Sequence, residues 1–173
     1  NQTLLASSDI GTTTSRFWIY VASTTGRITI STQDAGGTVN TVSGTTNICD
    51  GKKHSIGVSS SGTAWSITLD GVAEALIVVA GANTGDWFSD ITLRDNLTIG
   101  AMTNTSTGSY TIGEIGFTRV YSRELAVSEL LTNHQRGRKA TASDATGLVF
   151  NLPLTEGTGN PADTIIPATI TLT

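Results

Sequence analysis

The stretch from Asp50 to Gly71 constrains the fold most strongly, because two runs of alternating polar and apolar side chains are joined there by a tight turn. It reads DGKKHSIGVSSSGTAWSITLDG. Strict alternation places every second residue on one face of a strand. Ser61-Gly62 makes the turn between the two runs, and Asp70-Gly71 favours a tight hairpin turn after the second run. The apolar positions on one face of each run are Ile56, Val58, Trp65, Ile67 and Leu69. Such a meander has one dry face, which must be covered by a second layer.

Other segments repeat this pattern. Arg16–Ser23 and Arg27–Gln33 are rich in β-branched and aromatic residues, and Val72–Ala80 is a third apolar run. The chain is 38% hydrophobic and only 14% charged, with 19 glycines, which is typical of short strands and turns. One short helix is predicted near 126–136, ending at Gly137. We therefore expect an all-β, two-sheet antiparallel jelly-roll sandwich with this single helix.

Short motifs in a fixed order extend the argument. Asp-Gly-Lys-x-His precedes an alternating run, a later strand ends in Asp-Gly, Ile-Gly follows, and an Arg-x-Leu leads into the predicted helix. The matching positions are Asp50, Gly51, Lys52, His54, Asp70, Gly71, Ile99, Gly100, Gly113, Ile115, Val120, Tyr121, Arg123 and Leu125. In this order the chain resembles the concanavalin A-like jelly rolls of the laminin G-like group, over roughly residues 15 to 135. It also resembles modules of phage tail and fibre proteins.

The C-terminal section raises a question about domain organisation. Residues 147–173 begin GLVFNLPLTEGTGNPADT, which is similar to the strand with which such domains often start. We expect residues 1–173 to form one domain in which this section supplies a closing strand, because an unpaired apolar strand would leave an adhesive edge. The alternative is that the section starts a truncated next module.

Charge and hydropathy exclude two classes of partner. The formal net charge is −4 and the isoelectric point is near 5.0, so we expect no nucleic-acid binding through phosphate neutralisation. Arg136, Arg138 and Lys139 lie where the predicted helix ends, a position at which the helix dipole favours cations. No apolar run reaches 18 residues, so we expect no membrane insertion.

The sequence does not suggest an enzyme. Glucanases of this fold carry a strand with Glu-x-Asp-x-x-Glu, whose carboxylates flank the glycosidic bond. Glu114 stands alone in its predicted strand. We expect His54 to be a core histidine on the apolar face of its strand, and Cys49 to be a buried, unreactive thiol at a strand end.

A long loop over Gly81–Asn96 holds the predicted ligand-binding residues. Trp87 and Phe88 lie between Asp86 and Asp90. An aromatic shelf beside carboxylates suits a sugar ring, whose C–H face packs on π-systems while its hydroxyls need acceptors. The alternative is that the two rings cover the core or pack on a neighbouring subunit.

The resemblance also implies calcium, which related domains hold with loop carboxylates. Asp86, Asp90 and Asp95 are the candidate ligands, and the alternative is that they are solvated loop acids. Trp18 and Trp65 are expected in the core.

We therefore predict a non-catalytic binding or adhesion module that recognises glycans or another cell-surface ligand, within a larger extracellular or virion assembly. The main alternative is a structural virion or fibre domain that forms homo-oligomers or contacts other virion subunits. A glucanase-type glycoside hydrolase is the third and least favoured interpretation, because the paired carboxylates are missing.

Overall fold

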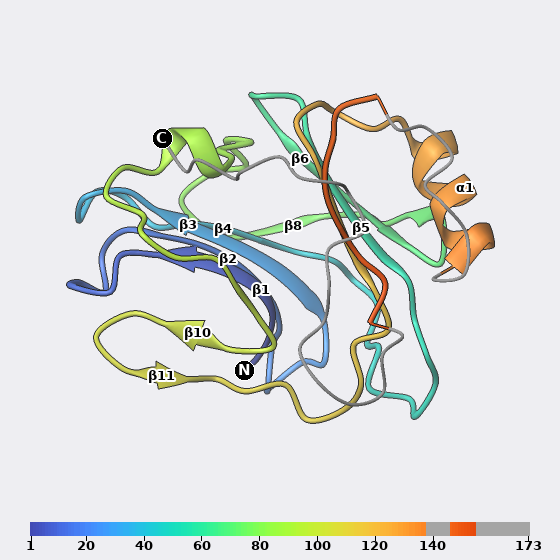
Figure 1. Cartoon of the computed structure of the whole chain (residues 1–173), viewed down its shortest axis with the longest axis horizontal. Helices are drawn as coiled ribbons and strands as arrows, with labels where there is room; N and C mark the ends of the chain where they lie inside the picture. Colours follow the sequence, from blue (N-terminus) through green and yellow to red (C-terminus); the bar gives the residue numbers. More distant parts are fainter. Residues whose placement is uncertain (138–145, 155–173) are drawn as a thin grey trace.

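Two layers of antiparallel strands form the protein, as a computed structural model describes it for residues 1–137 and 146–154 (Figure 1). The larger sheet has the strand order β8-β4-β3-β2-β1-β9. Its strands are β1 (Gln2–Ser8), β2 (Arg16–Val21), β3 (Ile28–Gln33), β4 (Asn40–Ser43), β8 (Ile77–Ala80) and β9 (Thr98–Ile99).

The second layer contains a three-stranded sheet in the order β5-β6-β7 and the pair β12-β13. Its strands are β5 (Ile56–Ser60), β6 (Trp65–Leu69), β7 (Val72–Ala73), β12 (Thr118–Tyr121) and β13 (Leu148–Leu152). The remaining elements are the hairpin of β10 (Met102–Thr103) and β11 (Thr107–Gly108), the 3-10 turn η1 (Phe88–Asp90) and the helix α1 (Val127–Arg136). The predicted jelly-roll sandwich with one short helix is confirmed. No helix among the described residues is long and apolar enough to span a bilayer.

The core lies where the inward faces of the layers meet. Alternation along β2 turns Phe17, Ile19 and Val21 inward. Trp65 and Ile67 face them from β6 and are only 2% and 1% exposed. Complete burial of side chains of this size contributes about 1.5–3 kcal/mol each, so this inward-facing set fixes the register of both sheets.

The helix α1 lies on the outer side of the second layer (Figure 1). A Cβ added at Gly57 of β5 would lie 3.0 Å from Leu130 Cδ2, and one added at Gly71 would lie 2.4 Å from Leu131 Cδ1. Both glycines therefore leave space that the two leucines fill. The Asp70-Gly71 turn thus joins β6 to β7 and also leaves space for Leu131 of the helix.

A wide cleft opens between the layers. It measures about 1690 Å³ and receives apolar side chains from both sheets, including Leu5, Ile19 and Val58. β13 pairs antiparallel with β12 at one side of the second layer. Most of residues 147–173 lies outside the described part of the chain, so closure of the sandwich by this section stays a prediction.

His54 and Cys49 differ from their predicted environments. β5 begins only at Ile56, so His54 lies in the preceding loop, where Asp50 and Asp70 approach both sides of its ring. Cys49 is exposed. Both predictions were wrong because strand bounds were misplaced: β5 begins two residues after His54, and β4 ends at Ser43, six residues before Cys49.

Asp50, His54 and Asp70 form a polar clamp that joins the loop before β5 to the turn after β6. His54 Nδ1 lies 2.8 Å from Asp70 Oδ2, and Nε2 lies 3.0 Å from Asp50 Oδ1. The hydrogen bonds to Asp70 and Asp50 raise the pKa of His54 above its ordinary value, because both ring N–H groups of the imidazolium can then donate. The hydrogen bond from His54 lowers the pKa of Asp50 to about 2.

Substitution of Gly71 by Ala should destabilise the fold more than substitution of Gly62. Both glycines have positive φ, +81° and +83°, but an added Cβ meets Leu131 at Gly71 and nothing within 4 Å at Gly62. Left-handed backbone alone costs about 1–2 kcal/mol in each variant, and overpacking adds about 1–3 kcal/mol for Gly71→Ala. Urea unfolding measures the difference, and equal losses would contradict the helix contact.

Stability should fall as pH rises above 6.5. The clamp raises the pKa of His54 from 6.5 in the folded state, so its stabilisation is complete below that pH and is lost as pH passes the folded-state pKa. We expect His54→Gln to flatten the pH dependence of the unfolding free energy and His134→Gln to leave most of it. Denaturant titrations between pH 5 and 9 test this, and an unchanged slope in His54→Gln would refute it.

Candidate functional site

The two aromatic residues of the predicted binding loop lie against the core. Trp87 and Phe88 are half-buried at η1, with ring centroids 5.0 Å and 4.6 Å from that of Phe17. These contacts match the alternative in which the rings cover the core. The two rings also line the interlayer cleft, and a role in ligand binding stays a prediction.

The predicted loop carboxylates each have a separate structural partner. Asp86 Oδ2 accepts from Thr32 Oγ1 at 3.2 Å. Asp90 Oδ2 accepts from the backbone N–H three residues earlier at 2.7 Å, and Asp95 Oδ1 accepts from Ile10 N at 3.1 Å. Among residues 1–137 and 146–154, no three His, Cys, Asp or Glu side chains are grouped so as to hold a metal ion. The structure thus does not bring the three predicted calcium ligands together.

A second aromatic pair lies on the outer face of the large sheet. The alternation that turns three residues of β2 inward turns Arg16, Trp18 and Tyr20 outward. The rings of Trp18 and Tyr20 stack with centroids 4.0 Å apart and an interplanar angle of 27°, and Trp18 Nε1 donates to Thr3 Oγ1 at 3.0 Å. Trp65 is in the core as predicted, but Trp18 is not. The alternation within RFWIYV could have identified this outward face.

The hairpin of β10 and β11 lies beside this outer face and lines an open pocket together with it. Thr3 N donates to Ser109 O at 2.9 Å, and Ser8 Oγ donates to Thr103 O, so the hairpin is attached to β1. The outer-face pocket has a volume of about 240 Å³. Its lining residues are Thr13, Arg16, Trp18, Met102, Asn104, Ser106, Gly108 and Ser109.

Arg16 is the charged group of the outer-face pocket. Its Nη1 donates to Thr13 O and, at 2.7 Å, to Gln33 Oε1. The guanidinium is half-buried, and this burial lowers its pKa, although an arginine stays protonated. Burial likewise raises the pKa of Tyr20. The pocket therefore combines an aromatic surface with one cation.

Several polar side chains of the pocket have hydrogen-bonding capacity left over. Within the part of the chain that the structure describes, four pocket groups make no hydrogen bond: Thr13 Oγ1, Asn104 Nδ2, Ser106 Oγ and Ser109 Oγ. Hydroxyls both donate and accept, and an amide nitrogen donates. The pocket can thus form several hydrogen bonds with a ligand rich in hydroxyl groups.

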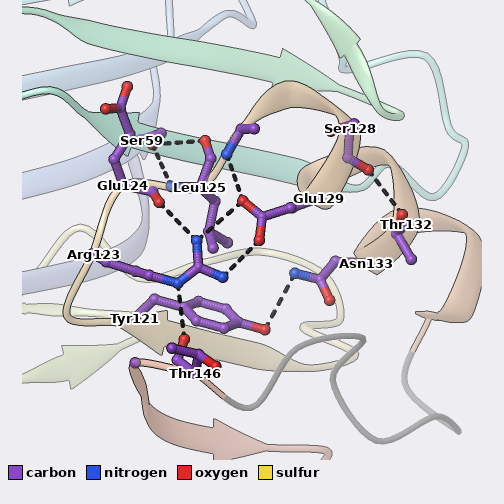
Figure 2. A network of polar contacts seen from close by, with 12 residues as sticks. Ser59, Tyr121, Arg123, Glu124, Leu125, Ser128, Glu129, Thr132, Asn133 and Thr146 are labelled. Carbon is purple, nitrogen blue, oxygen red and sulfur yellow. Dashed lines mark hydrogen bonds and ion pairs between the residues drawn. The ribbon is translucent and has the colours of Figure 1, made fainter.

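Another polar network lies where the helix begins, and it is structural (Figure 2). Arg123 binds Glu129 through two bonds, from Nη2 at 2.6 Å and Nη1 at 3.1 Å. Arg123 Nε also donates to Thr146 O at 2.9 Å, while Glu129 Oε2 accepts from Ala126 N at 2.8 Å. These bonds join the start of α1 to the segment that leads into β13. They account for the arginine of the Arg-x-Leu motif.

Comparison with solved structures gives two weak likenesses. The CBM40 of the Ruminococcus gnavus IT-sialidase is 17% identical, with 76% of this chain and 72% of that chain covered and a TM-score of 0.47. An S-layer domain-containing protein from Clostridium thermocellum ATCC 27405 is also 17% identical, with a TM-score of 0.38. That match covers 75% of this chain and 60% of the S-layer domain-containing chain, which is less than two thirds of the latter's length.

Comparison at the level of sequence families is decisive. No curated protein matches the chain significantly. The family model described as Laminin G domain matches residues 2–113, from the start of β1 to the loop beyond the β10–β11 hairpin. This match includes the six strands of the large sheet and the three-stranded sheet, and it agrees with the observed jelly roll. The chain therefore belongs to the laminin G domain family.

Proposed function

We propose that this laminin G domain is a non-catalytic module that binds glycans through the outer-face pocket, as part of a larger extracellular or surface assembly. One observation carries the proposal. The stacked pair of Trp18 and Tyr20 lies on the same outward face as a pocket whose hydroxyl and amide groups have unused hydrogen-bonding capacity.

The chemistry of the pocket suits a sugar better than an apolar ligand. A pyranose ring has an apolar C–H face, which packs on an aromatic ring such as Trp18. Its hydroxyl groups need both donors and acceptors, and the hairpin wall offers Asn104, Ser106 and Ser109. The volume of about 240 Å³ lies below the roughly 300–1,000 Å³ of sites for drug-sized ligands. We therefore expect the pocket to hold one sugar unit of a longer chain.

Trp18→Ala should weaken glycan binding by at least about tenfold, because truncation of a central aromatic contact typically costs more than 1 kcal/mol. A glycan array with wild-type protein, Trp18→Ala and Trp87→Ala compares the two aromatic sites. We expect Trp87→Ala to keep its binding and lose stability, because its ring packs on Phe17.

Circular dichroism and thermal unfolding identify any variant that fails to fold. Ser106 lines the pocket from the exposed part of the hairpin. Ser106→Ala removes only its hydroxyl group and is therefore a milder second test of the pocket. If wild-type protein binds no glycan, the proposal is wrong. If Trp87→Ala alone abolishes binding, the ligand site is the η1 loop.

A second candidate function is assembly with further copies of this chain, and the edge strand β8 favours it. β8 ends the large sheet, and its Ile77, Val78 and Val79 are 44%, 52% and 62% exposed. The strand contains no charge and no proline, which are the features that commonly protect sheet edges. Antiparallel pairing of two β8 strands about a two-fold axis would join their unpaired backbone groups.

Val78→Lys should abolish self-association if β8 forms this contact, because a charge on an edge strand opposes pairing. Ile112→Lys is the matched control, since it adds the same charge at an apolar side chain that is 85% exposed. The backbone N–H of Ile112 donates to Gln2 Oε1 in β1, away from β8 in the strand order. Light scattering across a concentration series measures the mass. Wild-type protein that stays monomeric at the highest concentration would exclude this contact.

A further inference from the structure

The hydrogen-bond inventory of Arg16 leaves one edge of its guanidinium unused. A guanidinium has five N–H donors. Both donors of Nη1 are occupied, by Thr13 O and by Gln33 Oε1. Nε and Nη2 form no hydrogen bond with any residue that the structure describes. Two of the three remaining donors, Nε–H and one N–H of Nη2, lie side by side along the Nε–Nη2 edge, which is a geometry that matches the two oxygens of a carboxylate.

The charge of Arg16 is also uncompensated. Over residues 1–137 and 146–154, no carboxylate lies within ion-pair distance of this guanidinium. Arg16 lies on the outward face of β2, is half-buried and lines the outer-face pocket. A partly desolvated cation gains from an anionic partner more than a fully solvated one does, because less water screens the attraction.

The neighbourhood of Arg16 differs from those of two other arginines, Arg94 and Arg123. Arg123 has its carboxylate in Glu129. The guanidinium of Arg94 lies over the Phe88 ring, 5.7 Å from its centroid, and donates to Ile91 O and Ser7 Oγ. Both are therefore held by the protein itself. Arg16 alone of these three combines a free donor edge with a place in the lining of the outer-face pocket.

We infer that the outer-face pocket selects an acidic sugar, whose carboxylate pairs with the Nε–Nη2 edge of Arg16 while its ring packs beside Trp18. This inference rests on the proposed function and names its ligand class. A uronic acid has the required combination, a planar carboxylate on a pyranose with several hydroxyl groups. Asn104 and Ser106 then lie on the opposite wall as partners for those hydroxyls.

The test compares sugars that differ only in charge. Oligosaccharides of galacturonate, glucuronate and mannuronate are each measured beside their methyl esters, which keep the ring and mask the carboxylate. Isothermal titration calorimetry is run with wild-type protein, Arg16→Gln and Lys53→Gln. Lys53 is the matched control because its side chain is 91% exposed and pairs, among the described residues, with the surface residue Glu114. The substitution removes the same charge from a residue that does not line the outer-face pocket.

We expect wild-type protein to bind at least one uronate at least about tenfold more tightly than its ester, as is typical of hydrogen bonds to charged groups. Arg16→Gln should remove this preference while it still binds the ester, and Lys53→Gln should keep the preference. Ester binding also shows that Arg16→Gln is folded. Added salt should weaken binding of the acid more than binding of the ester.

The outcomes separate the two proposals. Equal binding of acid and ester, binding of neutral glycans only, or an acid preference that survives in Arg16→Gln would overturn the role of Arg16 and leave glycan recognition intact. Absence of binding to every acidic and neutral glycan would overturn both.

Discussion

The two-faced character of β2 is the constraint on which the rest of the structure depends. Its inward residues pack into the interlayer core with Trp65 and Ile67, and this packing fixes which way every second side chain points. A shift of one residue would exchange the two faces. It would bury Arg16 and expose Phe17, so the core and the outer-face pocket are specified by the same register.

The fold could be predicted from the sequence because its signals are local. Alternation, Asp-Gly turns and one capped helical segment are all readable within a few residues, and the hairpin at Asp70-Gly71 and the helix were observed close to their predicted places. The apolar run Val72–Ala80, in contrast, divides into β7 and β8, which lie in different sheets. The errors also have local causes. His54 was assigned to a strand that begins two residues later, at Ile56, and two Asp-Gly pairs, at Asp50 and Asp70, each bring one carboxylate to its ring.

The candidate site could be predicted only in part. Alternation in RFWIYV already places Arg16, Trp18 and Tyr20 on one face. The sequence gives no local signal that the hairpin from Met102 to Gly108 lies beside that face. The bonds that attach the hairpin to β1 join residues that are far apart in the sequence, such as Ser8 and Thr103. The opposite error arose at Trp87, where aromatic and acidic residues adjacent in sequence suggested a site, although their side chains turn to different partners.

The attachment of the hairpin to β1 has a consequence for how the pocket responds to occupancy. Its two walls come from distant segments, and the hairpin is held by bonds such as Thr3 N to Ser109 O and Asn96 Nδ2 to Thr103 O. A molecule that contacts both walls binds only while the β10–β11 hairpin is attached to β1. Its binding free energy is therefore shared with hairpin docking, so saturation should slow amide hydrogen exchange along β10, β11 and β1 together.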